Sequence, residues 1–175
     1  MKTLPAVLLA LSVLLVTSRS SPEERVCSVD DVLALMDRAP ATEFGKAPHK
    51  WSRVGQANRI ARAISRAAKT TEQAADLVIY DLYESANTVS AIGDHGKSHG
   101  PWQISEDRAA PAVAHDPDKA APIWLELADK SRSDCADLPD DEQLAEVASG
   151  SCKAGRTLAR RRAALRRRIL AAAMQ

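Results

Sequence analysis

The sequence is poor in aromatic residues, in cysteine and in long apolar runs. Its 175 residues include one Phe, two Tyr, three Trp and three Cys. The length fits one domain and argues against a multidomain enzyme with a separate nucleotide-binding half. Hydrophobic residues make up 45% of the chain, so it is not disordered by composition. Many of them are alanine, which favours close-packed helices over a β-sandwich.

Several catalytic and metal-binding motifs are also missing. The chain has no Gly-x-Ser-x-Gly nucleophile elbow, no phosphate-binding loop and no His-Glu-x-x-His zinc motif. Asp94, His95 and His99 lie in a glycine-rich stretch, where helical spacing of metal ligands does not apply. We therefore expect no metal ion and no cofactor. No internal repeat or low-complexity linker divides the chain.

The longest apolar run lies at the start of the chain. A short basic start precedes the apolar residues 4–16, and small residues follow at 17–20. Such a run is too short to cross a bilayer comfortably and is typical of a secretory signal peptide. We predict a signal peptide at residues 1–20 and a single mature domain at 21–175, secreted, periplasmic or at the cell envelope. The alternatives are a buried N-terminal helix and a retained anchor.

The three cysteines follow this leader and would meet an oxidising compartment, where disulfides form. An odd number leaves one thiol over or pairs it between chains. We favour Cys135–Cys152, because that loop joins two predicted helices and its closure would stabilise the fold by about 3 kcal/mol in the chain-entropy model. Cys27–Cys152 is the main alternative.

Apolar spacing and capping signals predict an all-α fold. Helices are expected at residues 28–38, 52–68, 71–85, 116–130, 140–148 and 155–174. Thr70 and Gln73 make a capping box for the third of these helices. Residues 86–114 hold three glycines and two prolines, and they are predicted to be the least helical segment.

One glutamate stands at the end of the third predicted helix. Glu84 occupies a C-terminal position, where the partial negative charge of the helix disfavours an anion. If its side chain points inward, burial disfavours the anion as well. Both effects favour the protonated carboxylic acid that a general acid needs. The structural alternative is a solvated surface glutamate followed by an ordinary turn.

Four short motifs lie in and after this helix end. They are Glu-Ser, Gly-Asp-x-Gly, Gly-x-x-Gln-Ile and, at residues 144–150, LAEVASG. Together they resemble the lysozyme-like superfamily, in particular the soluble lytic transglycosylases and goose-type lysozymes. The last motif is similar to the family's Leu-Ala-x-Tyr-Asn-x-Gly helix. The resemblance covers about residues 70–170.

The resemblance implies a compact lysozyme-like helical bundle that cleaves peptidoglycan between N-acetylmuramic acid and N-acetylglucosamine. Glu84 would be the general acid and then the base of a lytic transglycosylase, which forms a 1,6-anhydro sugar. Asp94 would be the second carboxylate of a hydrolytic lysozyme, which has to hold a water molecule. The substrate-binding residues would be Ser85, Gly100, Trp102, Gln103 and Ile104.

The sequence departs from the family at one position beside the catalytic glutamate. The tyrosine that hydrogen-bonds that glutamate falls at Val147 here, and the following asparagine falls at Ala148. Tyr80 and Tyr83 are candidates to replace the missing tyrosine. The alternative function is a non-catalytic glycan-binding or cell-wall-binding protein on the same fold.

The end of the chain is strongly basic. Eight positive side chains and no acid follow Val147; they are Lys153, Arg156, Arg160, Arg161, Arg162, Arg166, Arg167 and Arg168. Export argues against a nucleic-acid partner. We expect a monomer that binds peptidoglycan and, through this helix, anionic cell-wall polymers or membrane surfaces. In the alternative, the eight acids of residues 126–146 neutralise the helix within the fold.

Overall fold

The computed structural model describes residues 27–38 and 54–173, and these residues are mostly helical. The helices are α1 (Val29–Arg38), α2 (Val54–Ala67), α3 (Thr71–Glu84), α4 (Pro111–Ala114), α5 (Pro117–Asp134), α6 (Ala145–Ser149) and α7 (Cys152–Ala173). The all-α prediction is therefore broadly confirmed. The predicted signal peptide at residues 1–20 lies outside the described residues. None of the described helices has the length and apolar character needed to cross a membrane.

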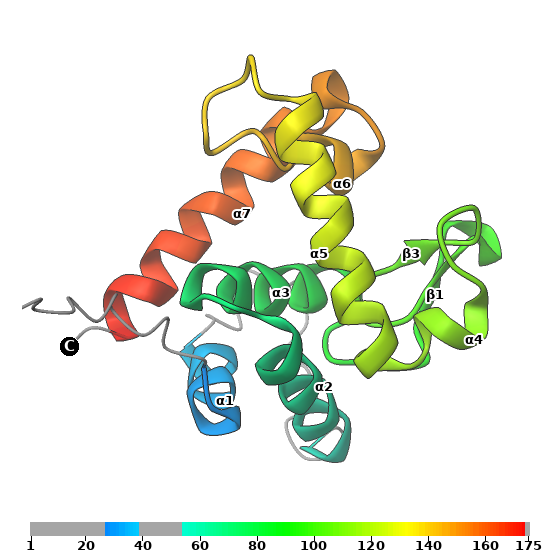
Figure 1. Ribbon diagram of the computed structural model, residues 1–175, viewed down its shortest axis with the longest axis vertical. Coiled ribbons are helices and arrows are strands. Elements are labelled where there is room, and N and C mark those ends of the chain that lie inside the picture. The colour runs from blue at the N-terminus through cyan, green and yellow to red at the C-terminus, as the bar shows by residue number, and fades with distance from the viewer. Residues whose placement is uncertain (1–26, 39–53, 174–175) are drawn as a thin grey trace, which may run out of the picture.

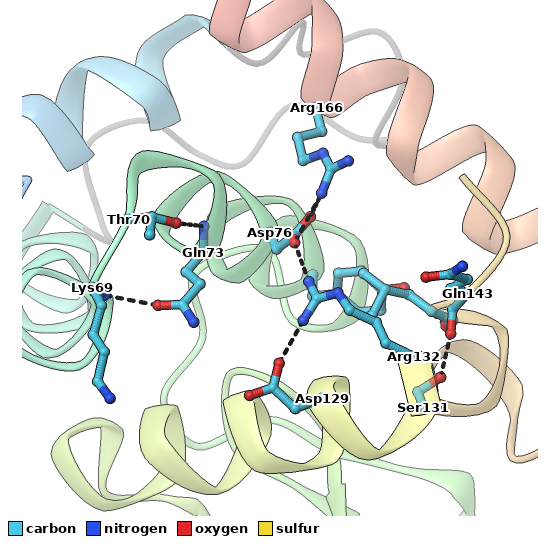
Figure 2. A network of polar contacts seen from close by, with 11 residues as sticks. Lys69, Thr70, Gln73, Asp76, Asp129, Ser131, Arg132, Gln143 and Arg166 are labelled. Carbon is cyan, nitrogen blue, oxygen red and sulfur yellow. Dashed lines mark hydrogen bonds and ion pairs between the residues drawn. The ribbon is translucent and has the colours of Figure 1, made fainter. Parts of the chain in front are cut away.

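Helix α3 is the centre of the fold, with α1, α2, α5 and α7 packed around it (Figure 1). Thr70 caps its start, because the side chain accepts a hydrogen bond from the backbone N–H of Gln73 at 3.2 Å. The Gln73 side chain accepts from the backbone N–H of Lys69 (Figure 2), so the return bond of the predicted capping box reaches the residue before the cap rather than Thr70 itself. Residues 74–82 are all buried. Burial all round is typical of a helix in the interior.

Three aromatic side chains of the described residues, Tyr80, Trp102 and Trp124, are buried in the core beside α3. The rings of Tyr80 and Trp124 are 4.7 Å apart between centroids. Trp102 is also buried, and its indole Nε1 donates a hydrogen bond to the carbonyl of Leu77 at 2.8 Å. Each of these rings contributes a large apolar area, and the polar atom of Trp102 is satisfied inside the core.

Residues 86–114 contain more regular structure than the sequence predicts. The strands β1 (Ile92–Gly93), β2 (Ser98–His99) and β3 (Ile104–Ser105) form a small antiparallel sheet in that order, and a 3₁₀ turn, η2 (Asp94–Gly96), connects the first two. In this register Ile92 lies opposite His99. Strands of two residues leave no alternating pattern in the sequence, so the fold has a small sheet that the helical prediction omits.

Three helix boundaries also differ from the prediction, and one of them is the end of α5, which lies at Asp134 rather than at residue 130. The expected helix at residues 140–148 begins only at Ala145, because residues 140–144 form turns in which the N–H of Glu142 bonds the carbonyl of Pro139. Helix α7 begins at Cys152 rather than at residue 155, since the Ser151 hydroxyl accepts from the N–H of Ala154 at 3.2 Å and caps it.

The predicted disulfide between Cys135 and Cys152 is present, with 5.5 Å between the two Cα atoms. It joins the end of α5 to the start of α7. Cys27 is a free buried cysteine whose thiol donates a hydrogen bond to the Thr71 hydroxyl at 3.6 Å.

Candidate active site

A cleft of about 590 Å³ lies between the end of α3, the glycine-rich loop, α5 and α6. Five of the residues predicted from the sequence line this cleft: Glu84, Asp94, Trp102, Gln103 and Ile104. Val147, Ala148 and Gly150 of the LAEVASG motif line it too. Motifs far apart in the sequence therefore meet at one surface.

Glu84 is the last residue of α3 and lines the cleft. Its Oε1 accepts a hydrogen bond from Nη2 of Arg162 on α7 at 2.6 Å. The Glu84 side chain is 26% exposed, whereas that of Arg162 is 8% exposed. Such a charge-assisted hydrogen bond is stronger than a neutral one, so it holds the carboxylate in place.

Two tyrosines of α3 enclose the guanidinium of Arg162. Its central carbon lies 4.2 Å from the ring centroid of Tyr80 and 5.1 Å from that of Tyr83. The helical spacing of Tyr80, Tyr83 and Glu84 places all three on one face of α3. This spacing is visible in the sequence, but nothing there indicates that Arg162 is the arginine that packs against the face.

Tyr80 also connects α3 to the motif at residues 144–150. Its hydroxyl donates a hydrogen bond to the carbonyl of Leu144 at 3.3 Å. Burial raises the pKa of Tyr80 above its ordinary value, in spite of the nearby Arg162. Tyr80 therefore bonds the chain before α6 through a neutral hydroxyl and packs its ring against the guanidinium of Arg162.

The glycine-rich loop is held together by contacts among the predicted motif residues. Asp94 is exposed, has a left-handed φ of 48°, and accepts a hydrogen bond from the Ser98 hydroxyl at 2.6 Å. The Gln103 side chain donates to the carbonyl of Gly100 at 2.9 Å. A Cβ atom on Gly93 would lie only 2.1 Å from Oε1 of Gln103. The Gln103 amide thus packs directly on the backbone of Gly93, and its end would have to move to make room for a larger residue there.

Gly100 and Ser85 do not line the cleft but support its walls. Gly100 has a φ of 77°, and a Cβ atom there would lie 1.8 Å from the carbonyl oxygen of Ala114. The Ser85 hydroxyl donates to Oδ1 of Asp81 at 2.7 Å and accepts from the N–H of Thr88 at 3.1 Å. Ser85 thus holds the turn after α3, and Gly100 allows the loop after β2 to pack closely against the end of α4.

The cleft is also lined by charged residues that the sequence analysis did not predict to be site residues. Glu146 and Lys130 line the cleft, and the Lys130 Nζ lies 3.6 Å from the Glu146 carboxylate. Lys130 also pairs with Asp134, and this contact raises the pKa of the lysine. Glu146 lies inside the LAEVASG motif, so its position was a usable signal. Lys130 has no comparable signal.

Most arginines of α7 have partners within the fold. Glu142, whose side chain is 2% exposed, accepts hydrogen bonds from Arg156 and Arg160, and these bonds lower its pKa. The other pairs are Arg162 with Glu84, Arg166 with Asp76, and Arg167 with Asp141. Two acids of residues 126–146, Glu142 and Asp141, thus pair with three of these arginines, and α3 supplies two further acids.

Within the described residues, one group of side chains has the spacing of metal ligands. It consists of Cys135, Cys152 and Glu146. The two cysteines are joined in the disulfide and provide no thiolate. His99 instead pairs with Glu106, with 2.9 Å between Nε2 and Oε1.

No protein-family model matches this chain, and neither a curated protein nor a solved structure matches it. The cleft and its contacts are therefore the basis on which a function has to be proposed.

Proposed function

We propose that the chain is a peptidoglycan-cleaving enzyme with a lysozyme-like fold, and that it acts as a lytic transglycosylase through Glu84. The observation that carries the proposal is the position of Glu84 in the wall of a cleft that also contains Gln103, Ile104 and residues 147–150. These segments carry the motifs that resemble the superfamily. Their meeting at one cleft supports a common site, because unrelated turns would have no reason to converge.

In the proposed reaction Glu84 donates a proton to the glycosidic oxygen, and the bond from the muramyl C1 to that oxygen breaks. The Glu84 carboxylate then accepts the proton of the muramyl 6-hydroxyl, whose oxygen bonds to C1. The proton is returned to Glu84, a 1,6-anhydro sugar forms, and no water is consumed. Because Oε1 of Glu84 is paired with Arg162, the side chain has to take up a proton or leave Arg162 before the first step.

Asp94 supports a hydrolytic version of the same proposal. It lines the cleft with Glu84, and its hydrogen bond from Ser98 orients the carboxylate. An inverting hydrolase uses a second carboxylate to hold the attacking water. Its products end in a reducing sugar rather than in an anhydro sugar.

The ion pair with Arg162 favours a second candidate function, a glycan-binding protein without catalysis. A carboxylate fixed by a guanidinium accepts hydrogen bonds from sugar hydroxyls, whereas a general acid has to carry a proton. In this alternative the cleft binds peptidoglycan and releases it unchanged.

Digestion of purified peptidoglycan, followed by mass analysis of the soluble fragments, separates these functions. We expect the wild type to release anhydro-ended fragments and Glu84→Gln to release none. The glutamine is a suitable variant because its carbonyl oxygen still accepts a hydrogen bond from Arg162. Glu126→Gln is the matched control, because Glu126 is an exposed residue of α5 that does not line the cleft.

The other outcomes decide between the alternatives. Reducing ends that disappear in Asp94→Asn would indicate a hydrolase. If the wild type binds peptidoglycan but releases no fragments, the result would indicate the non-catalytic, glycan-binding function. Activity retained in Glu84→Gln would exclude Glu84 as the acid.

The substrate lies outside the cytoplasm, so the proposal also requires export. The predicted leader at residues 1–20 would provide it. N-terminal sequencing of the protein recovered from the cell envelope or the medium should then begin near residue 21.

A further inference from the structure

We propose that Arg162 is the positioning residue of this site and takes the role of the tyrosine that is replaced by Val147. The inference rests on the proposed function of Glu84. Arg162 and Glu84 are separated by 78 positions in the chain, yet their side chains are in direct contact at 2.6 Å. The valine at position 147 lines the same cleft, and its side chain has no group that can donate a hydrogen bond.

The surroundings of Arg162 restrict its orientation. The side chain is 8% exposed, and both Tyr80 and Tyr83 lie within the range of about 6 Å at which a cation is attracted to an aromatic ring. The planar guanidinium can stack on such rings, so the two tyrosines define the direction of its N–H groups. The donor to Glu84 is therefore aimed by α3 itself.

The hydrogen bonding of Arg162 is incomplete, which argues against a purely structural role. Its Nε and Nη1 atoms are buried and have no hydrogen-bond acceptor among the described residues. Unsatisfied buried donors are rare, and an apolar side chain in place of a buried charge is often equally stable. Besides its contacts with the two tyrosine rings, the guanidinium is hydrogen-bonded to the Glu84 carboxylate, and that bond best explains why a cation is kept here.

That contact engages one oxygen of the carboxylate. Nη2 donates to Oε1, so the plane of the carboxylate is held while Oε2 is not occupied by Arg162. Glu84 lines the cleft, and Oε2 is therefore the oxygen through which proton transfer to the glycan takes place. Misplacing a reacting group by about 1 Å can lower a rate by about 100-fold.

The test compares Arg162→Met and Arg162→Lys with Arg166→Met on a soluble fragment built of N-acetylglucosamine and N-acetylmuramic acid. Arg166 lies one turn further along α7 and pairs with Asp76, which does not line the cleft. It controls for the loss of an ion pair between α3 and α7. For each variant kcat, KM and the midpoint of thermal unfolding are measured.

Arg162→Met should lower kcat by about 10- to 100-fold, with KM changed by less than about twofold, because only the alignment of Glu84 is lost. Arg162→Lys should recover part of kcat, since lysine keeps the charge but lacks the planar fork. Arg166→Met should lower the unfolding midpoint and leave kcat within about twofold of the wild type.

Two results would overturn the positioning role. One is a wild-type kcat in Arg162→Met; the other is a loss of kcat that is equal in Arg162→Met and Arg166→Met. If Arg162→Met does not fold, Arg162→Lys decides, and a wild-type kcat in that variant has the same meaning. A wild type that releases no product is a different result: it removes the proposed function, and the role of Arg162 with it.

Discussion

Helix α3 meets α7 through two ion pairs, and these two contacts face different surroundings. Towards the start of α3, Asp76 is 5% exposed and accepts hydrogen bonds from Arg166 and Arg132 (Figure 2). At its end, Glu84 is 26% exposed, accepts from Arg162 and lines the cleft. Asp76, Tyr80 and Glu84 follow one another at intervals of four positions, so all three lie on one face of the helix.

The two carboxylates differ in their exposure to solvent and in the number of arginines that they contact. Burial raises the pKa of Asp76 even though Arg166 and Arg132 act in the opposite direction. Two arginines from α5 and α7 meet at that carboxylate, and this arrangement joins three helices. Glu84 has Arg162 on one side and the cleft on the other. The same kind of ion pair is therefore enclosed in the interior at one end of α3 and borders a cleft at the other.

The largest effect on stability is expected from Asp76→Ala. The change leaves Arg132 and Arg166, which are 32% and 25% exposed, without their shared acid, and the loss of such a partner costs about 1–3 kcal/mol. Urea denaturation measures the loss, and glycan cleavage per folded molecule should be unchanged. Asp129→Ala is the control, because Asp129 also pairs with Arg132 but is 65% exposed. Equal losses in the two variants would contradict the comparison.

An intermediate effect on stability is expected from Tyr80→Phe. Tyr80 lies on α3 between the two ion pairs. Because burial raises the pKa of Tyr80 in the folded state, its contribution to stability is complete below the unfolded value and is lost as the pH rises. Above about pH 10 the free energy of unfolding of the wild type should fall by up to about 1.4 kcal/mol per pH unit. The Tyr80→Phe variant should not show this fall. Urea denaturation at several alkaline pH values measures both slopes, and identical slopes would contradict this.

The smallest effect on stability is expected from Glu84→Gln. The glutamine still accepts from Arg162, and the tyrosine rings remain on the guanidinium, so the unfolding free energy should fall by about 1 kcal/mol. The same variant should have lost all cleavage activity. A loss as large as that of Asp76→Ala would show that the Glu84 end also serves mainly the fold.

Local features of this fold were predictable because they depend on neighbouring residues. The Thr70 cap of α3 and the Ser28 cap of α1 each follow from residues three positions apart. The disulfide was predicted correctly from the expected helices on either side of its loop. The strands of the glycine-rich loop were not predicted, because two residues cannot establish a period.

Parts of the candidate site were predictable for a similar reason. Glu84, Asp94 and Gln103 belong to short motifs with recognisable spacing, and all three line the cleft. Lys130 was missed because its role depends on a helix that only packing brings to the cleft. Glu146 was assigned only to the acidic stretch, although it lies within a motif.

The sequence by itself determined the helix that ends at Glu84 and its Thr70 cap, and it favoured the Cys135–Cys152 disulfide over Cys27–Cys152. The helix and its cap depend on backbone geometry and on residues close together in the chain. Only the tertiary structure decided which acid each arginine meets. Eight positive side chains follow Val147, and sequence spacing does not distinguish among them. The packing of α7 on α3 places Arg162 at Glu84 and Arg166 at Asp76, because an ion pair depends on distance in space.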